Sequence, residues 1–173
     1  SYESSPEQAL ATATRFFKEA GAMAVKLEGA HLSTIEKLTA SGIPVMGHLG
    51  LTPQSLHQLG GYRVQGRSDG DAILEAALAL EKAGAFAIVL ELVPAELATR
   101  ITAALTIPTI GIGAGVACDA QVLVWTDMVG LTKNAPKLAK AYRNLRAEIL
   151  GAATEFADEV RAGTFPSEDQ TFH

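Results

Sequence analysis

Two stretches of the chain carry almost the same pattern: KEAGAMAVKLEGA at residues 18–30 and EKAGAFAIVLELV at residues 81–93. They align at an offset of 63 residues, the separation between Lys18 and Glu81. Each copy holds a short apolar run that ends on a glutamate, Glu28 in the first and Glu91 in the second. The clearest mismatch in this alignment is a charged residue, Lys26, aligned with the apolar Val89. The sequence pattern of a buried strand therefore occurs twice, and only one copy carries a lysine.

The bulk composition describes a globular chain. Its 173 residues are enough for a single domain, residues 1–173, with a sizeable core. With 48% hydrophobic and 19% charged residues, the chain is not of the disordered class. A net charge of −5 without a basic cluster argues against a nucleic-acid partner. Cys118 is the only cysteine, so an intrachain disulfide is excluded and a reducing cytoplasm is expected. No apolar run reaches the ~18–20 residues of a membrane span, so no membrane partner is expected.

Strands and helices are expected to alternate along the chain. The expected strands are AMAVKLEG at 22–29, IPVMGHLG at 43–50, AFAIVLEL at 85–92, IPTIGIGAG at 107–115 and QVLVWTDM at 121–128. The expected helices run from a Ser5 cap to Gly21, within 32–41, from a cap at Asp69 or Asp71, from Pro94, and over about 136–162. Residues 51–68 read as a long glycine-rich loop. This alternation is typical of βαβ units and a parallel sheet.

The length of the repeat favours a (β/α)₈ barrel. An offset of 63 residues spans two βα units, and eight such units need the roughly 250 residues of a TIM barrel. A doubly wound sheet is the rival fold, and it predicts a ligand site where the strand order reverses. We expect the last five βα units of a (β/α)₈ TIM barrel, followed by a long C-terminal helix. The first three strands are expected from upstream sequence or from a partner chain, or to be missing altogether.

Strand alternation selects the candidate site. Lys26 and Glu28 share one face of the first strand, while Val25 and Leu27 share the other. The apolar face suits the outer helices, so the charged face should point into the barrel, near the C-terminal rim where barrel active sites lie. The same alternation turns His48 of the second strand and Glu91 of the third strand inward. A lysine, two glutamates and a histidine are therefore expected to converge.

Each of these residues also has a less specific interpretation. Lys26 and Glu28 could form a surface ion pair, and His48 could be a core histidine whose hydrogen bonds are satisfied. Glu91 follows AFAIVL and is harder to dismiss, because a buried carboxylate is costly unless it is paired or functional. Glu81 and Glu96 are expected to be ordinary carboxylates on helix surfaces. GIGAG at 111–115 precedes a strand, not a helix, so the dinucleotide interpretation fails.

These residue types suit enolate chemistry. A carboxylate that binds a divalent cation, together with a lysine, can stabilise an enolate oxygen. The second carboxylate can then remove a proton from the carbon beside the carbonyl. Residue types alone leave the substrate open.

Five blocks, in order, resemble the ketopantoate hydroxymethyltransferase family. They are VKLEG, GHLGLTPQS, GGYRVQGR, VLELVPAELA and IPTIGIGAG with CDAQVLVWTDM, and the resemblance extends to the closing FPSEDQTFH. It implies a (β/α)₈ barrel and a cytoplasmic, commonly decameric homo-oligomer. The implied reaction uses Mg²⁺ and transfers a hydroxymethyl group from 5,10-methylenetetrahydrofolate to 3-methyl-2-oxobutanoate, giving 2-dehydropantoate. By motif, Lys26 would bind the ketoacid, Glu28 would bind magnesium, Glu91 would accept the proton, and His48 would line the substrate site.

The chain also departs from the family pattern. The family's two magnesium aspartates are expected upstream of Ser1, Ala120 stands where a glycine is usual, and Gln170 stands where a histidine is usual. An open five-stranded barrel would expose apolar core side chains and two strand edges, so the 173-residue chain by itself is expected to self-associate. One glutamate alone holds Mg²⁺ poorly, so the chain is also expected to turn over negligibly. Two alternatives stay open: another metal-dependent ketoacid enzyme, such as a lyase, and a non-catalytic barrel fragment.

Overall fold

The computed structural model describes residues 2–173 and divides the chain into two compact units, Ser1–Val122 and Leu123–His173. The first unit holds the sheet and all of the predicted site residues. The second unit holds α5 (Trp125–Met128), α6 (Leu145–Ala162) and the short 3₁₀ turn η2 (Glu168–Gln170). That residues 1–173 form a single domain stays a prediction.

The first unit is built on a five-stranded, all-parallel sheet. Its strands are β1 (Val25–Lys26), β2 (Val45–Gly50), β3 (Ala87–Glu91), β4 (Thr109–Ile112) and β5 (Ala120–Gln121). They lie in the order β1-β2-β3-β4-β5, each hydrogen-bonded to the next strand along the chain. A doubly wound sheet would reverse its strand order at some point, and this sheet does not. Sequential order is the arrangement of successive barrel units.

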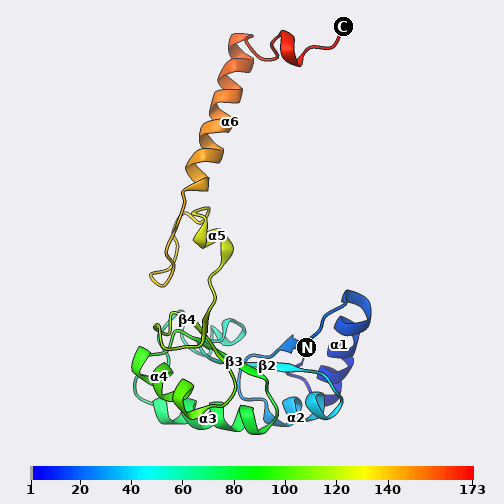
Figure 1. Cartoon of the computed structure of the whole chain (residues 1–173), viewed down its shortest axis with the longest axis vertical. Coiled ribbons are helices and arrows are strands. Elements are labelled where there is room, and N and C mark those ends of the chain that lie inside the picture. Colours follow the sequence, from blue (N-terminus) through cyan, green and yellow to red (C-terminus); the bar gives the residue numbers. More distant parts are fainter. Residues whose placement is uncertain (1) are drawn as a thin grey trace. The chain divides into compact units, whose positions relative to one another are not determined.

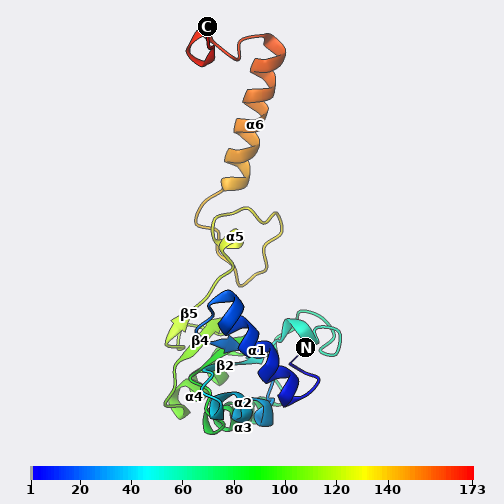
Figure 2. The ribbon, with the colours of Figure 1, turned by 90° about the vertical axis from the view of Figure 1, so that its right-hand side faces the viewer.

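Four helices accompany the sheet: α1 (Pro6–Ala20), α2 (Leu32–Ala40), α3 (Gly70–Lys82) and α4 (Ala95–Ala104). Helices α2, α3 and α4 lie on the same side of the sheet in both views (Figure 1 and Figure 2). The predicted cap of α1 is confirmed, since the Ser5 side chain accepts a hydrogen bond from the Gln8 N–H and Gly21 ends the helix in the left-handed region. Asp69 takes the N-cap position of α3, but its side chain makes no capping hydrogen bond.

The two faces of the sheet differ in burial. On β3, Ile88 and Leu90 point toward the helices and are fully buried at 0% exposure. They join Leu80 of α3 and Ile101 of α4 in one apolar core. On the other face, His48 and Val89 are also buried, but Glu91 and residues such as Ile110 and Ile112 of β4 keep intermediate exposure. The predicted alternation of the strands is therefore confirmed, because the face that carries the charged residues is turned away from the helices.

The fifth predicted strand is much shorter than expected. Pairing with β4 covers only Ala120 and Gln121, and Val122 adds one more hydrogen bond from its N–H to the Gly111 carbonyl. Beyond that point the chain turns into α5, where the Asp127 N–H donates to the Val124 carbonyl. The alternating apolar residues of QVLVWTDM are therefore not evidence of a long strand. Val124 and Trp125 stay 51% and 63% exposed.

The final helix also begins later than predicted, at Leu145 and not near residue 136. The N–H groups of Tyr142 and Leu145 donate to Met128 and Val129, so they are unavailable for a helix that continues from residue 136. Asn144 caps α6 by accepting a hydrogen bond from the Ala147 N–H. On α6, the large apolar residues Ile149 and Phe156 are exposed. Within residues 2–173, no helix is long and apolar enough to cross a membrane.

Candidate active site

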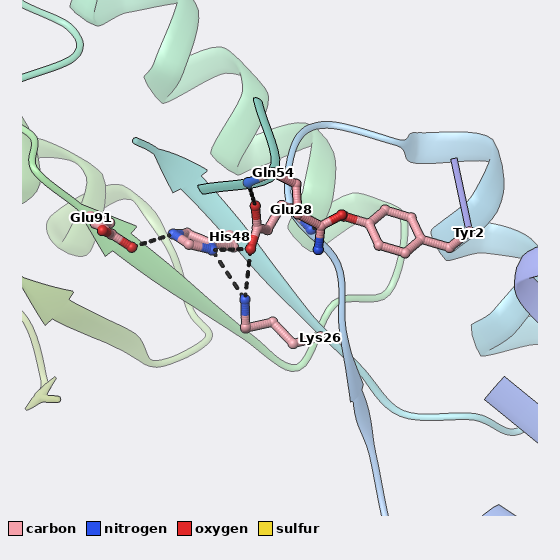
Figure 3. A network of polar contacts seen from close by, with 6 residues as sticks. All are labelled: Tyr2, Lys26, Glu28, His48, Gln54 and Glu91. Atoms are coloured by element: carbon pink, nitrogen blue, oxygen red, sulfur yellow. Dashed lines mark hydrogen bonds and ion pairs between the residues drawn. The ribbon is translucent and has the colours of Figure 1, made fainter. Parts of the chain in front are cut away.

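The four predicted site residues come together at one edge of the sheet (Figure 3). Lys26 Nζ lies 3.2 Å from His48 Nδ1 and 3.6 Å from Glu28 Oε1. His48 Nε2 lies 3.2 Å from Glu91 Oε2, and His48 Nδ1 lies 3.9 Å from Glu28 Oε1. A continuous line of polar groups therefore crosses three strands, from the first glutamate to the second. Their predicted convergence is confirmed, whereas their chemical roles stay predictions.

Strand register explains this convergence. Lys26 pairs with Met46 across β1 and β2, and His48 pairs with Val89 across β2 and β3. Paired residues of parallel strands share a face, so two steps along any of these strands returns to the same face. Glu91 therefore follows Val89 onto the face of His48, and Glu28 follows Lys26 at the end of β1. The offset between the two sequence copies places both glutamates at the C-terminal ends of their strands.

Glu28 is held at both of its oxygens. Oε2 accepts a hydrogen bond from the backbone N–H of Gln54, at 2.9 Å, and Oε1 faces the Lys26 ammonium. Its backbone N–H donates to the Tyr2 hydroxyl at 3.1 Å. The side chain is only 9% exposed, so these donors offset the cost of burying a carboxylate. Burial is also the main reason why the pKa of Tyr2 is raised above 10.0, which keeps its hydroxyl protonated.

Glu91 has a simpler environment. Its side chain is 15% exposed, and its only close polar neighbour within residues 2–173 is His48, whose own side chain is 4% exposed. The two lie at ion-pair distance, but the His48 N–H is not aligned well enough to donate a hydrogen bond, and Nε2 has no other partner. Within residues 2–173, the other Glu91 oxygen has no hydrogen-bond or ion-pair partner.

The backbone around Glu91 depends on close contacts. Gly50 pairs with Glu91 and has φ +91°, and a Cβ at this position would collide with the Glu91 carbonyl oxygen and with Val93. Leu92 has φ +47°, a left-handed conformation that is costly for a leucine. The Leu92 N–H donates to Ile112 and its carbonyl accepts from the Gln65 N–H, so neighbouring segments hold this turn. The chain therefore turns sharply directly after the Glu91 carboxylate.

The described residues do not form a magnesium site by themselves. Within residues 2–173, no group of three or more His, Cys, Asp or Glu side chains could hold a metal ion. Glu28 offers one carboxylate, and both of its oxygens already face donors, Gln54 and Lys26. Mg²⁺ is usually held by one or two carboxylates, substrate oxygens and water. Glu28 is thus at most one ligand of such an ion.

A large open groove lies elsewhere on the first unit. It has a volume of about 700 Å³ and is lined by residues including Val64, Arg67, Asp69, Pro94 and Arg100. None of the four predicted site residues lines it. Arg100 is paired with Asp71 at 2.6 Å. The chemistry of the candidate site therefore comes from the polar cluster and not from this groove.

Sequence reasoning missed Tyr2 and Gln54, which hold Glu28 through a hydroxyl and a backbone N–H. Neither contact has a signal in strand alternation, because both residues lie outside the strands. The prediction that Glu81 is an ordinary surface carboxylate is wrong. Its Oε1 accepts hydrogen bonds from the Thr106 N–H and hydroxyl and from the Ile107 N–H, which ties α3 to the turn before β4.

Comparison with known proteins gives consistent results. Residues 1–168 match the family described as Ketopantoate hydroxymethyltransferase. The chain is 57% identical to a 3-methyl-2-oxobutanoate hydroxymethyltransferase from Thermobifida fusca, over 99% of this chain and 63% of that protein. It is 60% identical to the protein of the same name from Saccharopolyspora erythraea, over 99% of this chain and 60% of that one. The chain thus spans about three fifths of the length of these curated relatives.

A solved structure extends the comparison to the fold. The crystal structure of phosphonopyruvate hydrolase matches with a TM-score of 0.50 and 15% sequence identity, over 97% of this chain and 60% of that one. At this identity the likeness concerns the fold alone. Together with the sequential parallel sheet, it confirms the predicted class, and the chain is part of a (β/α)₈ barrel.

Proposed function

Because the chain belongs to the ketopantoate hydroxymethyltransferase family, we propose that the protein transfers a hydroxymethyl group to 3-methyl-2-oxobutanoate and so forms 2-dehydropantoate. The donor in this proposal is 5,10-methylenetetrahydrofolate. The observation that carries the proposal is the convergence of Lys26, Glu28, His48 and Glu91 from three neighbouring strands. Such a cluster at the C-terminal ends of barrel strands is where this fold performs chemistry.

Each side chain has a distinct part in the proposal. Glu91 removes a proton from the third carbon of the ketoacid with the carboxylate oxygen that does not face His48. Lys26 brings a positive charge to the substrate's anionic oxygens and stabilises the enolate that forms. The Lys26 side chain is 43% exposed, so a ligand can reach it from the solvent. The enolate carbon then forms a C–C bond to the one-carbon unit of the folate. One water supplies the hydroxyl oxygen, and both C–N bonds to that carbon break, so that tetrahydrofolate leaves.

Mg²⁺ is the cofactor that we propose, with Glu28 as one ligand. An ion bound there would polarise the keto oxygen and acidify the neighbouring C–H bond. Both Glu28 oxygens already face donors, and no second metal-binding side chain groups with Glu28 within residues 2–173, so the other protein ligands would come from residues outside this range. By the family resemblance they are two aspartates. The same resemblance supports a cytoplasmic homo-oligomer, and specifically a decamer.

The test is a product assay on the complete protein. Incubation with the ketoacid, Mg²⁺ and 5,10-methylenetetrahydrofolate should yield 2-dehydropantoate, and leaving out the folate should abolish it. A lyase acting on the same ketoacid class would cleave a carbon–carbon bond with no folate present. A non-catalytic barrel fragment would give no product and no exchange of the ketoacid's third-carbon proton with deuterium oxide. Either of these results would refute the proposed reaction.

A further inference from the structure

We infer that His48 is a positioning residue for Glu91, and that Lys26 determines which nitrogen of the His48 ring carries the proton. From the sequence, His48 was predicted to be a substrate-binding residue of the site. The contacts assign it a different part, in which it acts through Glu91 and not on the substrate.

The first step is the position of the ring proton. Lys26 Nζ lies 3.2 Å from His48 Nδ1. A lysine ammonium can only donate hydrogen bonds, so Nδ1 must act as the acceptor. In a neutral imidazole the proton then resides on Nε2. This nitrogen is the one that lies 3.2 Å from Glu91 Oε2.

The second step is the reason that the tautomer depends on Lys26. Glu28 Oε1 lies 3.9 Å from the same Nδ1 atom, and Lys26 Nζ lies 3.6 Å from that oxygen. Lys26 is therefore the donor shared by the glutamate and the ring. Without the ammonium, Nδ1 would face only a carboxylate, which favours a proton on Nδ1. The proton would then leave Nε2, and Glu91 would face a ring lone pair.

The third step concerns Glu91. A buried Nε2–H without a good acceptor is destabilising, so this N–H favours any Glu91 orientation that brings an oxygen toward it. With one oxygen drawn toward His48, the other oxygen is left to face the substrate. A general base that is held in one orientation reacts faster than one that rotates freely. The sequence copies fit this arrangement, since Lys26 replaces the apolar Val89 of the second copy.

The tautomer can be measured without any activity. In protein labelled with ¹⁵N-histidine, the ring nitrogen signals of His48 report which nitrogen carries the proton, and a His48→Gln spectrum assigns them among the four histidines. We expect Nε2–H in the wild type, and a clear gain of Nδ1–H in Lys26→Met. A wild-type ring protonated at Nδ1, or a tautomer unchanged by Lys26→Met, would overturn the inference. Because this measurement needs no substrate, it stands even if the proposed reaction fails.

A matched pair of variants tests the effect on Glu91, and this part rests on the proposed function. Glutamine places its amide N–H near the position of Nε2, whereas asparagine places its amide near Nδ1. We expect His48→Gln to keep deuterium exchange at the ketoacid's third carbon within about 10-fold of the wild type. We expect His48→Asn to lose about 10²-fold, the scale of a misplaced general base, with ketoacid KM unchanged in both.

Two results would contradict this part. Better exchange in His48→Asn than in His48→Gln would mean that His48 serves to hold Lys26. A raised KM with unchanged exchange at saturation would mean that His48 binds the ketoacid directly. Absence of exchange in the wild type would instead count against the proposed function, and the tautomer measurement would still decide the inference.

Discussion

The two sequence copies, residues 18–30 and 81–93, form similar structures in different surroundings. The first copy yields only the two-residue strand β1 at the edge of the sheet, whereas the second yields the five-residue strand β3 at its centre. Both place a glutamate at the same end of the sheet. Glu28 is held by Lys26 and by the Gln54 backbone, and Glu91 has only His48 beside it. One strand pattern therefore gives two carboxylates with different freedom.

In the proposed function, this difference separates two chemical tasks. A carboxylate whose two oxygens both face donors is fixed in place, which suits binding and charge balance. A carboxylate with one free oxygen can accept a proton from a substrate. Lys26 is the residue that distinguishes the copies, because it occupies the position where the second copy keeps an apolar side chain. Introducing a lysine at the equivalent position of the second copy is the most direct way to disturb this separation of tasks.

Val89→Lys would carry the lysine of the first copy into the second, and it has the largest expected effect. Val89 is 8% exposed and lies between His48 and Ile110 in the centre of the sheet. A charge at this position would be largely removed from water, with only Glu91, two residues on along the same face, as a counter-charge. The free energy of unfolding should therefore fall by several kcal/mol. Urea unfolding followed by circular dichroism measures the loss. Val89→Met is the matched uncharged control, and an equal loss in both variants would show that size and not charge is responsible.

Glu91→Gln tests the division of tasks directly. It removes the proton acceptor but keeps the size and polarity of the side chain, so turnover should fall by about 10²-fold or more. Ketoacid binding should be nearly unchanged. Exchange of the substrate's third-carbon proton in deuterium oxide isolates this step in the complete protein. Exchange that stays at the wild-type rate would remove Glu91 from the role of base.

Glu28→Gln is the comparison variant. Glu28 is held by Gln54 and Lys26 and is not proposed to move a proton. We expect weaker Mg²⁺-dependent ketoacid binding, measured by calorimetry. If Glu28→Gln lost exchange as fully as Glu91→Gln and bound the ketoacid normally, the two carboxylates would not have separate tasks.

The aligned glycines Gly21 and Gly84 sharpen the same comparison on a smaller scale. Both have a positive φ, +67° and +97°, so alanine is strained at either position by about 1–2 kcal/mol. A Cβ at Gly21 would meet nothing within 4 Å, whereas a Cβ at Gly84 would meet Thr39 Oγ1 at 3.1 Å. Gly84→Ala should therefore lower the free energy of unfolding more than Gly21→Ala, by about 1 kcal/mol. Equal losses of unfolding free energy in the two variants, measured by thermal or urea unfolding, would show that the Thr39 side chain can move aside without loss of stability.

The sequence allowed the fold class and the site cluster to be predicted because both follow from periodic patterns. Alternation along β1, β2 and β3 was enough to place Lys26, His48 and Glu91 on one face. The failures lie where a tertiary contact decides the local structure. QVLVWTDM alternates like a strand, but only Ala120 and Gln121 pair with β4. The start of α6 was misplaced because the Tyr142 and Leu145 N–H groups bond to Met128 and Val129, which no local pattern indicates.

The smallest expected effect concerns Glu81, which begins the second copy where the first has Lys18. Hydrogen bonds from the Thr106 hydroxyl and N–H are the main reason that the pKa of Glu81 lies below its ordinary value of 4.5. The contribution of Glu81 to stability is therefore complete above the unfolded-state pKa, and it is lost as the pH falls through the lowered folded-state pKa.

Glu81→Gln should consequently lower the urea midpoint slightly at pH 7, and the difference from the wild type should shrink toward pH 3. The shrinkage follows because the wild-type carboxylate becomes protonated and loses its charge-assisted hydrogen bonds, whereas the amide of the variant does not titrate. Glu75→Gln is the control for replacing an exposed carboxylate on the same helix, because Glu75 lies in the middle of α3 and makes no hydrogen bond or ion pair within residues 2–173. A Glu81→Gln difference that stays constant with pH would mean that the shape of the side chain, and not its charge, ties α3 to the turn before β4.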